Sequence, residues 1–253
     1  MAATPPFEAA PAAYEAWAAA EVAHWRDGVL KPAGPLARSA RAVQQRINRA
    51  TPEKVHAAVT EVMQRMTRTI LTGADLVAGP PLADASLAQR DRRALEIIEN
   101  YRRIAAVEGG VAGAGGFWLA LADFPALLAI KIRLLFDLAA AYGHDGEAFA
   151  ERLYILHLFE LAFSSADNRA RVFHGLEGWD DRAHPVDFAH FDWRTFQQEY
   201  RDHIDLAKMV QLIPVIGAPV GAVVNWRLTQ RLGETAMNGY RMRWLAARQD
   251  ARR

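Results

Sequence analysis

Cysteine is absent from this chain of 253 residues, and its absence removes several kinds of chemistry. Without a thiol there is no disulfide, no iron–sulfur cluster held by thiolates, no thiolate zinc site and no cysteine nucleophile. Serine is scarce as well, and none of the four serines lies in the GxSxG turn of a serine hydrolase. The chain also lacks the Gly-Lys-Ser/Thr phosphate loop, the GxGxxG turn and the kinase signatures. The sequence therefore favours a non-enzymatic protein, and it predicts no cofactor.

A large net charge is missing too. Lysine and arginine number 30 and aspartate and glutamate 29, which leaves a formal charge of +1. Such a balance creates no overall field that would attract a nucleic acid, so we expect no nucleic-acid partner. The first residues, MAATPPFEAAP, have neither the basic nor the apolar region of a signal peptide. A cytoplasmic location is the resulting expectation.

What the chain does contain is typical of helices. Alanine, leucine and arginine are abundant, and 51% of the residues are hydrophobic. Apolar side chains recur at steps of three and four residues along most of the chain. Thr51-Pro52-Glu53 reads as a helix start, with an N-cap, a proline at the first position and an acid in the first turn. We expect an all-α protein with a single multi-helix domain over residues 7–248, and flexible termini at residues 1–6 and 249–253.

Two apolar stretches rich in glycine interrupt this amphipathic pattern, at residues 109–142 and 209–226. Gly109 and Gly113 lie four residues apart in the first, and Gly217 and Gly221 do so in the second. Small residues at this spacing allow two helix backbones to approach closely. We predict that the two Gly-rich stretches pack on each other as the central layer of the domain, covered by the amphipathic helices.

Two segments raise the question of membrane contact. A predicted helix after Pro35 has an apolar face opposite several arginines, a pattern that can lie on an anionic membrane surface. The uncharged run at 209–226 approaches the ~20 residues that span a bilayer, although its prolines argue against an ordinary span. A solvated helix and an ordinary protein core are the respective alternatives. The residues expected to contact lipid are Arg38, Arg41, Arg46, Val215, Ile216 and Val220.

Asp123 is an acid inside an apolar segment, directly before Phe124-Pro125. A buried carboxylate is costly unless it is paired, so Asp123 either caps a helix that begins near Pro125 or neutralises a base such as Arg133. The alternative is a binding pocket for a lipid or another small molecule. Its residues would be Trp118, Asp123, Phe124, Arg133 and Phe136.

Metal binding has two candidate places. His157 and Glu160 lie three apart on a predicted helix, which resembles half of a di-metal motif in reversed order. A hydrogen-bonded pair is the competing interpretation, because no matching second set appears. Four histidines between 174 and 203 lie among aspartates, without the close spacing of a metal motif, so scattered surface residues compete there as well.

Four segments together resemble the EcsC family, in order and over about residues 10–247. They are the N-terminal helix with Tyr14, Trp17 and Trp25, the glycine cluster leading into LADFPALLAIKIRLLFDLAAAYG, the run IPVIGAPVGAVVNW, and the terminal GETAMNGYRMRWL. Residues 164–205 do not follow the family pattern. The resemblance implies a protein encoded, in some bacteria, beside the parts of an ABC transporter, and it implies no catalytic residue.

These observations leave three functions. The first is a membrane-associated accessory or interaction protein, peripheral at the inner face of the membrane, with a membrane lipid or membrane protein as its partner. The second is a lipid or small-molecule binding protein, and the third is a metal-dependent enzyme.

Overall fold

The computed structural model describes residues 5–31, 53–72, 79–114, 116–164, 168–190 and 218–251. Within these ranges, side chains are described except at 53–57, 59, 109–123 and 218–221. The helices are α1 (Pro11–Leu30), α3 (Glu53–Thr72), α4 (Leu87–Ala114), α5 (Gly116–Ala141), α6 (Phe149–Phe163), α7 (Arg169–Leu176) and α10 (Ala218–Asp250), with two short 3-10 turns at Trp179–Asp181 and Phe188–His190. The described part of the chain is thus all-α with seven α-helices, which confirms the predicted class.

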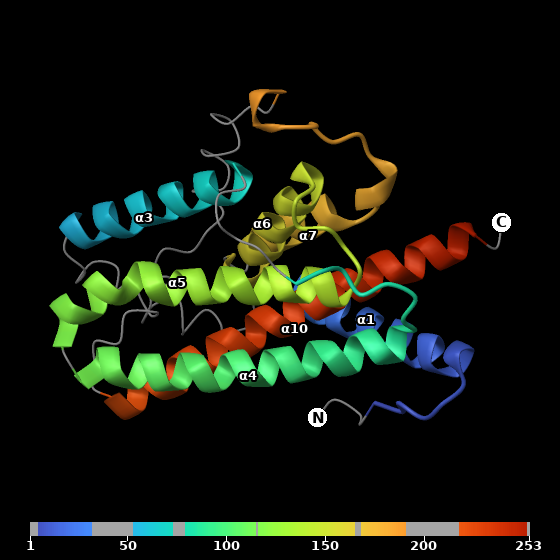
Figure 1. The fold of residues 1–253 in the computed structure, drawn as a ribbon, viewed down its shortest axis with the longest axis horizontal. Coiled ribbons are helices and arrows are strands. Elements are labelled where there is room, and N and C mark those ends of the chain that lie inside the picture. Colours follow the sequence, from blue (N-terminus) through green and yellow to red (C-terminus); the bar gives the residue numbers. More distant parts are fainter. Residues whose placement is uncertain are drawn as a thin grey trace.

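Three long helices form the body of the molecule (Figure 1). α4 and α5 make an antiparallel hairpin, in which Tyr101 of α4 lies opposite Asp137 of α5. α10 runs back along α4, since Asp91 near the start of α4 meets Arg241 near the end of α10. α1 packs on α4 and α10, α6 lies against α10 and α5, α7 contacts α6 and α1, and α3 lies over α5 and α6.

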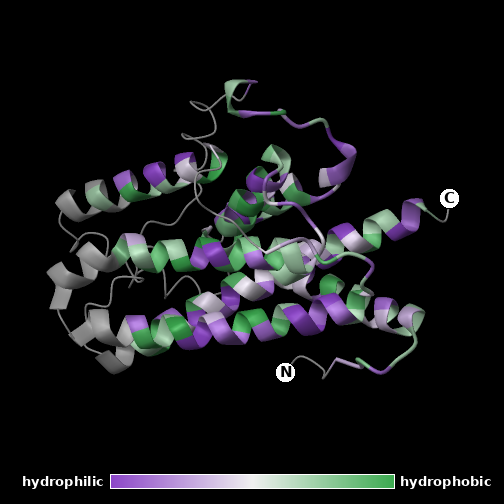
Figure 2. Ribbon diagram, viewed as in Figure 1, coloured by the Kyte–Doolittle hydropathy of each residue, from purple (hydrophilic) through white to green (hydrophobic). Residues whose placement is uncertain are grey.

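Local sequence explains where α4 begins and where α5 ends. Ser86 and Gln89 form a capping box: the Ser86 amide donates to Gln89 Oε1 at 2.8 Å, and the Gln89 amide donates to Ser86 Oγ at 3.3 Å. At the end of α5, Gly143 has a positive φ of 86°, a backbone conformation that glycine adopts without strain. Figure 2 shows hydrophilic and hydrophobic residues alternating along α4, while α5 is hydrophobic over most of its described length.

The helix start predicted near Pro125 is wrong. α5 begins at Gly116 and continues through Asp123 and Pro125 without a break, so Asp123 is not the N-cap of this helix. A proline inside a helix loses one backbone hydrogen bond and costs about 3 kcal/mol. The apolar face around it offsets that cost, because Phe124 and Leu127, on either side of the proline, are buried in the core.

The most completely buried helix among those described is α6. Of its 15 residues, 12 are buried, including Phe159 and Phe163, whose rings lie 4.6 Å apart. Most of the proposed Gly-rich layer falls on residues 209–217, or on side chains of 109–123 and 218–221, and these lie outside the described residues. The pairing of the two Gly-rich stretches therefore stays a prediction.

Gly233 of α10 lies directly against α4, and its replacement should destabilise the fold. A Cβ at this position would come within 2.6 Å of Cγ1 of Ile98, too close for either helix to accept without moving. We expect Gly233→Val to lower the free energy of unfolding by about 1–3 kcal/mol in urea denaturation. Gly28→Val is the matched control, because a Cβ there meets nothing within 4 Å. Equal effects of the two substitutions would contradict the close packing of α4 on α10.

Candidate functional site

A buried carboxylate, Asp91, joins three parts of the chain. Its side chain is fully buried and accepts a hydrogen bond from the Tyr14 hydroxyl at 2.8 Å and another from Nε of Arg241 at 2.8 Å. The Tyr142 hydroxyl donates to the second carboxylate oxygen. Burial alone would lower the pKa of Arg241, but the adjacent charge of Asp91 raises it above its usual value overall. Asp91 and Arg241 therefore form a buried ion pair between α4 and α10, and the two tyrosines connect α1 and the residue after α5 to it.

A second buried carboxylate, Glu151 of α6, forms a neighbouring cluster. It accepts hydrogen bonds from the Tyr240 hydroxyl and from Nη1 of Arg243, both at 2.7 Å. The same guanidinium donates to Asp180 from Nε at 2.9 Å and from Nη2 at 2.5 Å. Burial opposes ionisation of Asp180, but the hydrogen bonds from Arg243 lower its pKa overall. This cluster fixes the segment after α7 to the end of α10.

Stacked rings connect the two clusters into one polar network. The rings of Tyr142 and Tyr240 stack with centroids 5.3 Å apart, and the His144 ring stacks on Tyr240 with centroids 5.2 Å apart. Burial lowers the pKa of His144, so its imidazole stays neutral at pH 7. Burial also raises the pKa of both tyrosines well above 10, which keeps their hydroxyls protonated as donors. The groups named here bond to one another, so the network satisfies its buried polar atoms internally and stabilises the packing of the helices.

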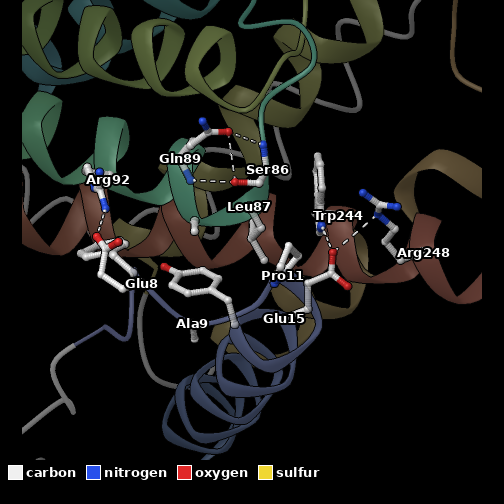
Figure 3. Close-up of a pocket in the computed structure, with 13 residues that line it drawn as sticks. Glu8, Ala9, Pro11, Glu15, Ser86, Leu87, Gln89, Arg92, Trp244 and Arg248 are labelled. Carbon is white, nitrogen blue, oxygen red and sulfur yellow. Dashed lines mark hydrogen bonds and ion pairs between the residues drawn. The ribbon is translucent and has the colours of Figure 1, made fainter.

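A pocket of about 330 Å³ lies beside this network, between the N-terminal segment, α1, the start of α4 and the end of α10 (Figure 3). We call it the aromatic pocket, because Phe7, Tyr14 and Trp244 line it. Glu8 and Arg92 lie at one end, and Glu15, Trp244 and Arg248 lie at the other (Figure 3). Tyr14 belongs to both features, since its ring lines the pocket and its hydroxyl binds Asp91.

The opposite end of the bundle has a different character. α4 ends there at Ala114, α5 begins at Gly116, and α10 begins at Ala218 (Figure 1). Apolar side chains are exposed on the approach to this end, on α4 at Ile104 and Val107 and on α10 at Val223. We call this region the apolar end. Among the described helices, none combines the length and the hydropathy that crossing a membrane requires.

A lysine is buried between α5 and α10. It lies closer to the apolar end of the bundle than the polar network does. Lys131 is fully buried, and its ammonium donates to the side-chain oxygen of Asn225 at 3.0 Å and reaches the Leu127 carbonyl at 3.5 Å. Burial lowers the pKa of Lys131 to about 8, although the charge of Glu108 acts in the other direction. The charge of Glu108 therefore compensates only part of the cost of burying this cation.

The structure describes the side chains of only some residues of the small-molecule pocket expected around Asp123. Phe124 and Phe136 are buried core residues of α5. Arg133 is half exposed on the same helix and pairs with Asp137 at 3.6 Å, so its described partner is not Asp123. The side chains of Trp118 and Asp123 lie outside the described ones. What the structure brings together is a different pocket, at the other end of the bundle.

The residues expected to contact lipid fall largely outside the description. Arg38, Arg41, Arg46, Val215 and Ile216 lie in ranges that the structure does not describe. Val220 lies in the first turn of α10, but its side chain is not among the described ones. These assignments stay predictions.

His157 and Glu160 are adjacent on α6, with Nδ1 of the histidine 2.9 Å from Oε2 of the glutamate. His174 pairs with Glu177 and His190 with Asp187 in the same way, each at 2.7 Å, and Nε2 of His184 lies 2.7 Å from the Trp179 carbonyl oxygen. His203 lies outside the described residues. In the part of the chain that the structure describes, no three acids or histidines gather closely enough to hold a metal ion.

The aromatic pocket and the Asp91 network were missed from the sequence, and their signals were weak. Aromatic residues at helical spacing, such as Tyr14 and Trp17, ordinarily indicate core packing, and Asp91 lies in the strongly charged run QRDRR, which is typical of a solvated helix face. The clearest signal was the motif GYRMRW, since it contains Tyr240, Arg241 and Arg243. All three point into the network.

Comparison with known proteins gives one family. The model of the EcsC protein family matches residues 17–245. The chain is similar to Protein EcsC of Bacillus subtilis (strain 168), with 39% identity over 226 residues, which is 89% of this chain and 94% of that protein. It is also similar to Uncharacterized protein YdbA of the same organism, with 30% identity over 166 residues, 65% of this chain and 61% of that one. No solved structure matches the chain.

Proposed function

The chain belongs to the EcsC protein family, and from that premise we propose that it is a non-enzymatic interaction protein that attaches to the inner face of the membrane through its apolar end. One observation carries the proposal: the consecutive ends of α4 and α5 and the start of α10, about 100 residues further along the chain, lie at one end of the bundle, and all three are poor in charge (Figure 1). Residues 109–122 and 218–226 contain no charged side chain.

The exposed side chains near this end support the proposal. Val107 is 68% exposed and Val223 is 50% exposed, on two helices that pack along each other. Single exposed valines are common on protein surfaces, but here they lie on two packed helices next to uncharged helix ends, which supports a surface for lipid or protein. Partial insertion of apolar side chains into the headgroup region is the usual mode of attachment for such surfaces.

The residues bordering the apolar end suit the boundary between lipid and water. Trp226 lies on α10 one turn beyond Val223, and the guanidinium of Arg102 lies over its ring at 3.7 Å. Arg103 and Arg227 are exposed beside them. Tryptophan and basic residues are enriched at membrane interfaces, where the indole sits at headgroup depth and the cation meets anionic lipid. The proposal therefore includes anionic lipid as the first partner.

Two finer parts of the proposal rest on the sequence. The Gly-rich stretches at 109–142 and 209–226 pack on each other in the proposal, and the basic segment containing Arg38, Arg41 and Arg46 adds attraction to anionic lipid. A subunit of an ABC transporter is the proposed protein partner. The family resemblance supports this partner, and no contact in the structure bears on it.

Vesicle flotation tests the attachment. We expect the purified protein to float with vesicles of anionic phospholipid, and the double variant Val107→Glu/Val223→Glu to lose at least about tenfold in bound fraction, because two carboxylates would have to enter the headgroup region. Flotation of the wild type in high salt separates the two contributions, since salt weakens attraction between charges and leaves apolar insertion intact.

Val186→Glu is the matched control for flotation. Val186 is 77% exposed in the segment after α7, away from the apolar end, so the variant should float as the wild type does. A wild-type protein that stays at the bottom of the gradient in every lipid and salt condition would overturn the proposal. Equal loss in the control and in the double variant would overturn it as well.

A further inference from the structure

The lining of the aromatic pocket combines apolar side chains with charged and polar ones, which suits a ligand that has both an apolar body and a charged group. The Phe7 and Tyr14 rings stack with centroids 5.8 Å apart, and Trp244 lies at the end of the pocket that holds Glu15 and Arg248 (Figure 3). Leu87, Ala88 and Pro11 complete the apolar lining. A volume of about 330 Å³ falls at the lower end of the range of small-molecule sites. The pocket therefore suits a compact ligand rather than a long chain.

Two ion pairs occupy the ends of the pocket, and they are held with very different strength. Glu8 is 95% exposed and its only described contact is with Arg92, at 3.1 Å. Glu15 is only 16% exposed, accepts a hydrogen bond from Trp244 Nε1 at 3.2 Å, and lies 3.6 Å from Nε of Arg248. An exposed ion pair contributes about 0–1 kcal/mol, so a ligand displaces Glu8 from Arg92 at little cost. The Glu15 pair stays in place.

Arg92 is the natural partner for an incoming anion. Its guanidinium lies over the Phe7 ring at 5.1 Å, which holds the planar group at the rim of the pocket. A guanidinium offers five donors, and the structure gives Arg92 a single hydrogen bond, from NH2 to Glu8. A carboxylate that replaces Glu8 can accept two of these donors at once.

We propose that the aromatic pocket binds a small organic carboxylate with a single negative charge and an aromatic or apolar body. The carboxylate takes the place of Glu8 on Arg92, and the body lies between Tyr14 and Trp244. A dianion is disfavoured because Glu15 remains in the pocket and repels a second negative charge. This inference is independent of the membrane proposal, since the pocket and the apolar end lie at opposite ends of α4.

The test uses 3-phenylpropionate as the probe, with its uncharged amide for comparison. We expect the acid to bind to the full-length protein and to shift the NMR signal of the Trp244 indole N–H, which is assigned by its loss in Trp244→Phe. Arg92→Gln should weaken binding at least about tenfold, because the carboxylate loses its charged hydrogen-bond partner. The amide should bind more weakly than the acid by a similar factor.

Glu8→Gln gives a result of opposite sign. It removes the competitor of the ligand for Arg92, so we expect the acid to bind a few-fold more tightly than it does to the wild type. A residue with only a structural role at this place would weaken binding on replacement.

Arg93→Gln is the matched control, because Arg93 is exposed on the same helix turn, pairs with Glu96 at 3.2 Å and does not line the pocket. Binding of the acid should be unchanged in this variant. The proposal is overturned if the probe leaves the Trp244 signal unmoved at millimolar concentration. It is also overturned if acid and amide bind equally, or if Arg92→Gln and Arg93→Gln have the same effect.

Discussion

Replacement of Asp91 by alanine is expected to lower the free energy of unfolding by about 3–5 kcal/mol, the largest effect that we anticipate for a single substitution. The reason is the group left behind. Arg241 is buried, and without Asp91 its charge has no carboxylate in the described structure to compensate it. The hydroxyls of Tyr14 and Tyr142 lose their acceptor at the same time. Urea denaturation followed by circular dichroism measures the change.

Two further variants show whether burial causes this effect. Glu96→Ala removes an ion pair on the exposed face of the same helix, and we expect it to change the free energy of unfolding by less than about 1 kcal/mol. Tyr14→Phe removes one of the three donors to Asp91 and should cost about 1–2 kcal/mol. If Asp91→Ala costs no more than Glu96→Ala, the network does not hold the helices together as we describe.

Replacement of Lys131 by methionine is expected to have the opposite sign and to stabilise the protein at pH 7, by about 1–3 kcal/mol. Methionine is apolar and close to lysine in length, so it fills the same space without a charge. The oxygen of Asn225 loses a donor, and this reduces the gain.

The pH dependence follows from the lowered pKa of Lys131. The folded value is about 8 and the ordinary value 10.5, so between these pH values the unfolded chain binds a proton that the folded protein has released. Stability from this group therefore rises as the pH increases from about 8 to about 10.5, and below pH 8 the full penalty is present. The difference in unfolding free energy between Lys131→Met and the wild type should shrink over that interval.

Arg133→Met is the control for this result. Arg133 lies two residues further along α5, is half exposed, and should contribute a constant difference across the same pH range. If Lys131→Met is less stable than the wild type, or if the difference does not depend on pH, a neighbouring group compensates the charge of Lys131 fully and the account is wrong.

Much of the fold was predictable because its signals are local. The periodicity of α3 and α4 and the capping box at Ser86 depend on residues within four positions of one another. The start of α5 was not predictable in this way. Pro125 ordinarily marks the first turn of a helix, and only the packing of Phe124 and Leu127 in the core shows that the helix passes through it.

The site was harder to predict, because its contacts join residues far apart in the sequence. Tyr14 lies 77 positions from Asp91, and Arg241 lies 150 positions from it. Nothing within the run QRDRR tells which of its charges turns inward, since that depends on α1 and α10. The pocket has the same property: Trp244 meets Glu15 across 229 positions. A charged helix and an aromatic helix can each be predicted from their own residues, but the contact between them cannot.

The attachment of the apolar end to lipid is the central claim, and a single fluorescent label tests it most directly. Because the chain has no cysteine, Val107→Cys carries the only thiol and takes up one environment-sensitive dye. On addition of anionic vesicles, we predict that the emission of the dye at position 107 moves to shorter wavelength and becomes shielded from aqueous iodide. The same dye at Val186→Cys should stay unchanged. A label at position 107 that remains as accessible to iodide as the label at 186 would contradict the account.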